Sequence, residues 1–382
     1  MSGTPNPRLR PGHSAQSGRV RGCPMAIPPD AGRPPAGAAD RLTSLDVDAI
    51  DDVALGARVL GSGGGGSPQT LAALARAVVG ASGPIPVVGL ADLPENGVVM
   101  FVAQVGAPQI LRERLPAHEA RIAATALIRH LGTRPVAFAS LEIGGSNALV
   151  SVPVAAALGV PIVDADGMGR AYARIDQTTM ALRGIPAAPF ALASPTGTWV
   201  LVGDADHGRA EDVLRAALPG LGGAAAAVLY AATAGRLRGA VIDGSLSRAA
   251  ALGRVLRRVQ ERRAPLGDFL RTGAATALFE GIVRRIEQVR SGTPTMVVTA
   301  VDARSGAVLR LDASEEFGVA LVDGEVLARE PDVIVAMDVR SWQVVMLDEL
   351  HVGRPLLVLR LPADPAWHAL GGARALGGAR VR

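Results

Sequence analysis

Lysine is absent from the 382-residue chain, so all 39 basic side chains are arginines. This excludes Schiff-base enzymes, a lysine-bound pyridoxal phosphate and a phosphate loop of the GxxxxGKS type. The only cysteine, Cys23, lies in the N-terminal tail. Internal disulfides, cysteine-ligated zinc and a cysteine nucleophile in the core are therefore excluded as well. Aromatic residues make up 3% of the chain and interleave with no basic stripe, so we expect no nucleic-acid partner.

Long hydrophobic runs are also lacking. The two longest, 148–163 and 220–235, are about 16 residues long, fewer than the roughly 20 that cross a bilayer. No apolar run follows the early arginines, so we expect neither a signal peptide nor contact with a membrane, and a cytoplasmic location. Residues 1–40 are rich in proline, glycine and arginine, and we expect them to form a disordered extension.

The first half of the remaining chain alternates helical and strand-like patterns. Helical spacing of apolar residues covers 48–60 and resumes after Ser67 and Pro68, with a glycine-rich run between these two helices. Strand-like runs at 98–105, 136–143 and 160–164 then alternate with helical segments at 116–131 and 147–158. This alternation predicts an α/β domain with a largely parallel sheet over residues 41–212.

The second half has a different pattern. We expect a helical part over residues 213–265, which includes a basic amphipathic segment at 247–263. From residue 266 to 382, short β-type runs follow one another and turn dipeptides such as Ser305-Gly306 separate them. Residues 213–382 are therefore predicted to form a C-terminal domain that is mainly β-rich, resembling a barrel or a sandwich.

Chemistry-bearing residues follow the predicted parallel strands. Crossovers between parallel strands bring their carboxyl ends to one edge, where ligands bind in open α/β sheets. Glu142 and Asp164 end two such strands, Asp166 and Arg170 follow closely, and the glycine-rich turns add Gly144, Gly145, Asn147 and Gly167. Carboxylates held close together would divide into an acid and a base. The alternative is that Asp164 and Asp166 only cap a turn and pair with Arg170.

The glycine-rich run at 61–66 formally satisfies GxGxxG. A dinucleotide site needs a strand before the motif and an acidic residue about 20 positions later. Here a helix precedes the run and Ser82 and Gly83 occupy the later position, so we reject that interpretation. Two others stay open. The amides of Gly63, Gly64, Gly65 and Gly66 could bind a carboxylate or another anion, or the glycines could only permit close packing of two helices.

Several segments resemble one known family. They are GARVLGSGGGGSP (56–68), LEIGGSNALV (141–150), VPIVDADGMGRAYARIDQTTM (160–180) and DELHVGRPLLV (348–358). Together they resemble the S-methyl thiohydantoin desulfurase family, formerly an uncharacterised-domain family, which is often linked to hydantoinase and oxoprolinase proteins. The resemblance extends in order over about residues 44–380.

The resemblance implies an α/β domain followed by a β-rich domain, and a hydrolase acting on a small cyclic amide or thioimidate. In the S-methylated thiohydantoin reaction, water adds to the ring carbon that bears sulfur, methanethiol leaves and a hydantoin remains. Glu142, Asp164 or Asp166 would activate the water, and Arg170 or a protonated carboxyl would assist the ring or the leaving group. Asn147 and the glycine amides would hold the polar atoms of the ring.

Two departures from the family keep other functions open. Arg174 stands where many relatives have an acid, and Ser314-Glu315-Glu316 stands where relatives tend to have an Asn-Glu pair. The alternatives are a non-catalytic protein that binds or senses a small molecule, and an accessory subunit of a hydantoinase- or oxoprolinase-type enzyme. We expect a small-molecule substrate and no organic cofactor. A divalent metal held by carboxylates and a homo-oligomer are both compatible with the sequence.

Overall fold

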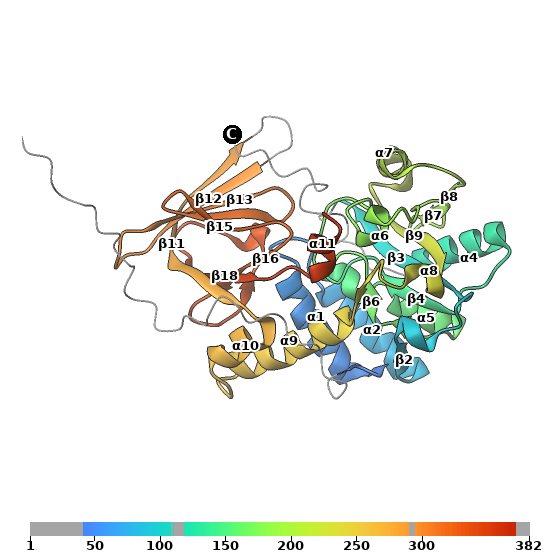
Figure 1. Cartoon of the computed structure of the whole chain (residues 1–382), viewed down its shortest axis with the longest axis horizontal. Coiled ribbons are helices and arrows are strands. Elements are labelled where there is room, and N and C mark those ends of the chain that lie inside the picture. Colours follow the sequence, from blue (N-terminus) through green and yellow to red (C-terminus); the bar gives the residue numbers. More distant parts are fainter. Residues whose placement is uncertain (1–40, 108–109, 111–117, 290–294, 372–382) are drawn as a thin grey trace, which may run out of the picture.

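The computed structural model describes residues 41–107, 110, 118–289 and 295–371. The predicted extension at 1–40, with Cys23, lies outside the described residues. Two units lie side by side in Figure 1, an α/β unit and a β unit, with α1 and α9 between their sheets and α10 below the β unit. Within the described ranges, no helix combines the length and the hydrophobicity that a membrane crossing requires.

The first unit is built on a mixed sheet of eight strands whose centre is parallel. Neighbouring strands β2, β5, β4 and β3 are parallel to one another, and antiparallel strands flank them on both sides. This confirms the predicted α/β class. The strands in spatial order are β1 (Ser44–Leu45), β2 (Ile85–Val88), β5 (Ile162–Val163), β4 (Ala137–Ser140), β3 (Val98–Gly106), β9 (Ala224–Thr233), β7 (Phe190–Ala193) and β8 (Trp199–Val202).

Both faces of this sheet are covered, which is why β3 is apolar almost throughout. Met100 and Val102 belong to the core on one face, and Val99 and Phe101 to the core on the other. Helices of the first face are α1 (Val47–Leu60), α2 (Gln69–Ser82), α4 (Glu119–Leu131), α5 (Val152–Leu158) and α9 (Ser245–Gln260). Shorter helices on the other face include α6 (Thr179–Leu182), α7 (His207–Ala217), α8 (Ala234–Leu237) and α11 (Pro365–Ala369).

Most of the predicted helices and strands of this unit are present, with shifted ends. The helix predicted over 48–60 is α1, and its N-cap is Asp46, which accepts a hydrogen bond from the Ala49 amide. The segment predicted to be one helix over 147–158 consists of a 3₁₀ turn, Gly145–Leu149, and then α5. Other 3₁₀ turns in the described part of the chain are Leu90–Asp92, Pro219–Leu221 and Leu347–Glu349.

The prediction that residues 213–265 are helical is wrong where strands form, at residues 224–233 and 242–243. Residues 224–233 form β9, which pairs with β3 and β7 inside the first sheet. Its sequence, AAAAVLYAAT, shows no alternation because both of its faces are buried. Alanine favours helices in isolation, but pairing on both edges of the strand overrides this weak preference. A two-stranded ladder of β6 (Ala165–Asp166) and β10 (Ile242–Asp243) completes this unit.

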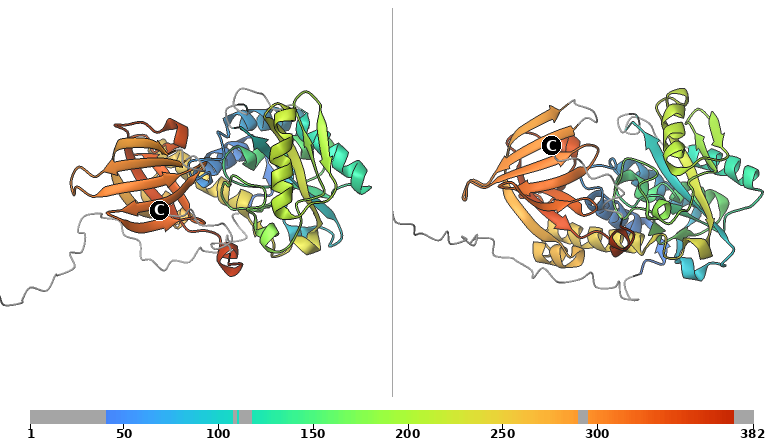
Figure 2. Two further views of the ribbon diagram at one scale, coloured as in Figure 1. Left: turned by 90° about the horizontal axis from the view of Figure 1, so that it is seen from above. Right: turned by 45° about the horizontal axis from the view of Figure 1, so that its top comes forward.

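The second unit confirms the predicted β-rich domain as an antiparallel sheet of eight strands. The sheet curves so that one of its faces encloses a core, which includes Phe279, Val298, Phe317 and Ile334. Figure 2 shows this curvature. Helix α10 (Leu266–Gly273) precedes the sheet. In spatial order the strands are β15 (Glu325–Arg329), β14 (Phe317–Val322), β13 (Val308–Ala313), β12 (Thr295–Val301), β11 (Thr276–Val289), β18 (Pro355–Leu361), β16 (Val333–Asp338) and β17 (Val344–Val345).

Candidate active site

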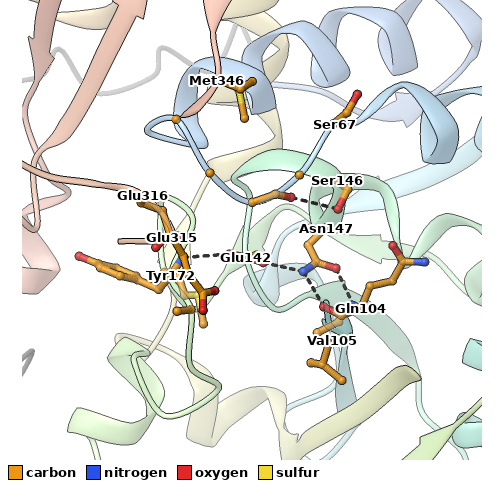
Figure 3. A pocket seen from close by; sticks show the side chains of 18 of the residues that line it. Ser67, Gln104, Val105, Glu142, Ser146, Asn147, Tyr172, Glu315, Glu316 and Met346 are labelled. Atoms are coloured by element: carbon orange, nitrogen blue, oxygen red, sulfur yellow. Dashed lines mark hydrogen bonds between the residues drawn. The ribbon is translucent and has the colours of Figure 1, made fainter. Parts of the chain in front are cut away.

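A cavity of about 570 Å³ lies where the two units meet. Its lining comes from the glycine-rich loop after α1, the end of β3, the turns after β4 and the residues before β14. Figure 3 shows Tyr172 of the first unit beside Glu315 and Glu316 of the second, with Glu142 and Asn147 of the first unit next to this group. The cavity is large enough for a small organic molecule and carries both polar and apolar groups, as ligand pockets usually do.

The glycine-rich loop brings three chain segments together. Gly63, Gly65 and Gly66 have φ values of 83°, 72° and 75°, a region that side chains with a Cβ rarely adopt. The carbonyl of Gly65 accepts hydrogen bonds from the amide of Ser146 (2.8 Å) and from its hydroxyl (3.0 Å). The loop therefore lies directly against the turn after β4, and the glycines are needed for both conformation and close contact.

Glu142 is the predicted acid that the structure places in the cavity. It follows β4, its side chain is buried, and both carboxylate oxygens accept hydrogen bonds. The Asn147 amide nitrogen donates to Oε1 at 2.5 Å, and the Tyr172 backbone amide donates to Oε2 at 3.1 Å. Burial raises the pKa of Glu142 to about 8 against these two donors, so this carboxyl can exchange a proton near neutral pH.

Asn147 orients this glutamate. Its Oδ1 accepts a hydrogen bond from the Gln104 amide at 2.6 Å, while its Nδ2 donates to the Gln104 carbonyl at 3.1 Å. These two bonds fix which end of the amide carries the nitrogen, so the remaining donor points to Glu142. Asn147 therefore lines the cavity, as predicted, and connects Glu142 to the end of β3.

A second buried carboxyl in the cavity, Glu316, was not among the predicted site residues. It directly precedes β14 in the second unit, and its side chain is buried. Burial raises its pKa to about 8, the Arg170 charge lowers it, and the charges of Glu142 and Glu315 raise it. Glu142 and Glu316 thus influence each other across the boundary between the units. Only the departure from the family pattern at 314–316 drew attention to this segment in the sequence.

Asp164 and Asp166 do not line the cavity. Asp164 accepts hydrogen bonds from the Ser247 amide (3.1 Å) and hydroxyl (2.6 Å) at the start of α9. Asp166 Oδ2 accepts three backbone amides, from Ile143 (3.0 Å), Met168 (3.0 Å) and Gly169 (2.7 Å). The predicted cleft shared by the three acids is therefore absent, because the two aspartates turn towards backbone donors. This matches the capping alternative in part, without the pairing to Arg170.

Arg170 is buried behind the cavity. Its guanidinium donates to the carbonyls of Ala171 (3.1 Å), Asp332 (2.5 Å) and Phe317 (3.2 Å). It also lies 4.8 Å from the centroid of the Tyr172 ring. With three carbonyls bound, Arg170 connects the two units and has no path to a ligand in the cavity.

The predicted glycines separate into two groups. Gly63, Gly64, Gly65 and Gly66 all line the cavity, whereas Gly144, Gly145 and Gly167 do not. A Cβ at Gly144 would overlap the Ala171 amide, and one at Gly145 would overlap the Gly65 carbonyl. These glycines allow the surrounding loops to approach. Among the described residues, no group of three or more His, Cys, Asp or Glu is arranged to hold a metal ion.

Comparison with known proteins decides the family. The S-Me-THD-like N-terminal domain matches residues 48–204, and the S-Me-THD-like C-terminal domain matches residues 205–381. The chain belongs to the S-Me-THD-like family. This confirms the resemblance seen in the sequence, and the two family domains together supply the residues that line the cavity of this S-Me-THD-like protein.

A crystal structure of a protein from Chromobacterium violaceum has the same fold. It superimposes with a TM-score of 0.70 at 24% sequence identity, covering 88% of this chain and 97% of that one. At that identity the similarity concerns the fold alone. No match was found among curated proteins. What the S-Me-THD-like cavity does must therefore be argued from its own residues.

Proposed function

We propose that this protein hydrolyses a small cyclic thioimidate or amide, with an S-methyl thiohydantoin as the model substrate. The observation that carries the proposal is the pair of buried carboxyls, Glu142 and Glu316, that enter one cavity from two family domains. Each has a pKa raised to about 8. Two interacting carboxyls of this kind readily share one proton, which leaves one group as a base and the other as an acid.

In the proposed reaction, ionised Glu142 takes a proton from water as the oxygen attacks the ring carbon that bears the methylthio group. A carboxylate has about four lone-pair sites, and Asn147 and Tyr172 use two of them, so a water molecule can still bind. Glu142 then passes its proton to the ring nitrogen. As the carbon–sulfur bond breaks, Glu316 protonates the sulfur and regains a proton from the hydroxyl of the adduct. Hydantoin and methanethiol result, with the atoms of one water consumed.

Fewer residues have a catalytic role in this reaction than the sequence suggested. Of the three candidate acids, only Glu142 keeps the role of base, because Asp164 and Asp166 bind backbone amides outside the cavity. Arg170 no longer assists the ring. In the glycine-rich loop the Gly64 amide donates to the Gly61 carbonyl at 2.9 Å. The amides of Gly63, Gly65 and Gly66 would therefore bind an anionic group of the substrate.

One observation favours the alternative of a non-catalytic binding protein. Arg174, which replaces an acid of many relatives, lies in the cavity lining and pairs with Asp176 at 2.8 Å. If the missing acid is essential, the cavity still binds the ligand but does not convert it. The two functions therefore differ in whether the ligand is converted and not in whether it is bound.

The test is methanethiol release from a series of S-methyl thiohydantoins, measured with the full chain. We expect Glu142→Gln and Glu316→Gln each to reduce kcat by about 10²- to 10⁴-fold, the usual contribution of a general acid or base. Glu325→Gln, on an exposed site of β15 in the same unit, is the matched control. Undiminished release by Glu142→Gln would reject the mechanism. Binding of the substrates without release by the wild type would identify a binding protein.

A further inference from the structure

Glu316 occupies an unusual position for an acid–base group. It belongs to the second unit, yet its side chain is 6% exposed and enters a cavity built mainly by the first. Among the described residues, none donates a hydrogen bond to its carboxyl, whereas Glu142 has two donors. The position of Glu316 therefore depends on how its backbone is held.

The backbone beside Glu316 is held by the first unit. The amide of Phe317 donates to the Ser62 carbonyl at 2.7 Å, and the Ser62 hydroxyl lies 3.3 Å from the Phe317 carbonyl. That same carbonyl accepts a hydrogen bond from Arg170 at 3.2 Å. Both polar backbone groups of Phe317 thus have partners from the other unit.

The glycine-rich loop supplies the space for this segment. A Cβ at Gly64 would overlap the Glu315 carbonyl and would stand 2.8 Å from Cγ and 2.9 Å from Oε1 of Glu316. Because backbone atoms cannot give way as a flexible side chain does, even alanine at 64 would displace Glu316. A glycine is therefore required at position 64 because Glu315 and Glu316 of the second unit pack directly against it.

Arg170 completes the support from the opposite side. Its side chain is 1% exposed and binds the carbonyl of Phe317 at the start of β14 and that of Asp332 just before β16. The Glu330 carboxylate lies 3.6 Å away. A guanidinium can satisfy several carbonyls at once through its planar set of donors, which neither lysine nor glutamine reproduces. The charge of Arg170 also acts on the Glu316 carboxyl.

We propose that Arg170 and Gly64 are positioning residues that hold Glu316 in the cavity through the Phe317 carbonyl and the space beside the glycine-rich loop. This inference rests on the proposed function for the role of Glu316, but its geometry is independent of any substrate. It also explains why a fully buried arginine belongs to a site that it does not touch.

The charged groups around Glu316 raise or lower its pKa. The groups that act on it are Arg170 from the first unit, Glu142 across the cavity, and Glu315 and Glu330 from its own unit. Arg170 lowers the pKa of Glu316, and the three carboxyls raise it. With Glu316 held in place, loss of the Arg170 charge would raise its pKa and Glu330→Gln would lower it. Burial is the largest cause of the raised pKa, so release of the side chain from its buried position lowers the pKa.

The experiment follows the protonated carboxyl of Glu316 by pH-difference infrared spectroscopy on the full chain. Glu316→Gln identifies its signal by subtraction, with no substrate present. We expect the midpoint to fall by about one pH unit or more in Gly64→Ala, which removes no charge, as Glu316 leaves its buried position. We expect a fall in Arg170→Gln as well, against the rise that loss of its charge alone would give. An unchanged midpoint in Gly64→Ala together with a rise in Arg170→Gln would overturn the proposal, because the arginine would then act on Glu316 by its charge alone.

Two further measurements separate the possible failures. If Arg170→Gln does not fold, the midpoint in Gly64→Ala still decides whether Glu316 is held in place. Glu330→Gln, whose side chain is 26% exposed, is the control for the loss of a charge alone. Gly64→Ala tests the space beside the loop and should lower kcat about as much as Glu316→Gln, with little added loss in the double variant. Absence of methanethiol release by the wild type would refute the proposed function alone, since the infrared shifts do not depend on turnover.

Discussion

The carboxyl-edge acids differ in what surrounds each one. Asp164 and Asp166 satisfy amides that would otherwise be buried without partners, including those at the start of α9 and after β6. An unpaired buried amide costs about 1–3 kcal/mol, so these positions need acceptors whatever the protein does. Glu142 has one methylene more and ends nearer the cavity. Spacing in the sequence cannot separate the two situations, because both require a carboxylate after a strand.

At this scale the ionisation of Glu142 predicts a pH-dependent stability. Its pKa is about 8 in the folded state and 4.5 in the unfolded state, so the folded protein binds the proton more tightly between these values. Its contribution to stability is complete below pH 4.5 and is lost as the pH rises through about 8. Glu142→Gln removes this loss. The variant should gain on the order of 3 kcal/mol relative to wild type between pH 5 and pH 8.

Urea unfolding of both proteins at several pH values measures this difference. A free-energy difference between Glu142→Gln and wild type that is the same at pH 5 and pH 8 would show that the buried carboxyl titrates as an ordinary glutamate. The prediction concerns the pH range in which the free-energy difference develops more than its size. Glu316 titrates in both proteins, and the charge of Glu142 acts on it.

At the scale of elements, much of the fold could be predicted from periodicity and capping. The spacing of Ile50, Val53, Ala57 and Leu60 gives α1, and the apolar run at 98–105 gives most of β3. The alanine-rich β9 could not be predicted, because its strand conformation comes from pairing with β3 and β7. Glu316 could not be predicted as a site residue for a related reason, because no local pattern reveals that a residue from the second unit enters a cavity in the first.

The packing of α1 against α9 is a further feature that only the structure reveals. A Cβ at Gly56 would overlap the Ala249 carbonyl, and one at Gly253 would overlap the Asp52 carbonyl. The helices therefore touch along their backbones. We expect Gly253→Ala to destabilise the protein by about 3 kcal/mol, since neither backbone can yield without moving its helix.

Gly80 is the matched control for this prediction. It lies in α2 and is exposed, and a methyl group added there would have no other atom within 4 Å. Gly80→Ala should stabilise the protein by about 0.5–1 kcal/mol, the ordinary gain of alanine over glycine in a helix. Thermal unfolding of the two variants compares them directly. A loss below about 0.5 kcal/mol for Gly253→Ala would mean that the helices separate at little cost.

At the scale of the whole molecule, the two units share a hydrophobic core. Residues of α1 and α9, such as Ile50 and Leu252, belong to the same buried cluster as Val335 of β16 and Leu359 of β18. The cavity lies along this shared boundary, and the bonds of Ser62 and Arg170 cross it. Unfolding one unit would expose the core of the other, so the described parts of the two units should unfold together.

Hydrogen exchange tests this coupling with the Gly253→Ala variant. The substitution lies on α9, but the core shared by the units transmits its cost to strands whose buried residues belong to a different cluster. Amides of β12 and β13, in the outer part of the second sheet, should therefore lose protection by the same free energy as amides of β3. Faster exchange confined to β3 and its neighbours would show that the units open separately. In that case Glu316 would leave the cavity whenever the first unit opens, and its place in the site would depend on local motion of the boundary.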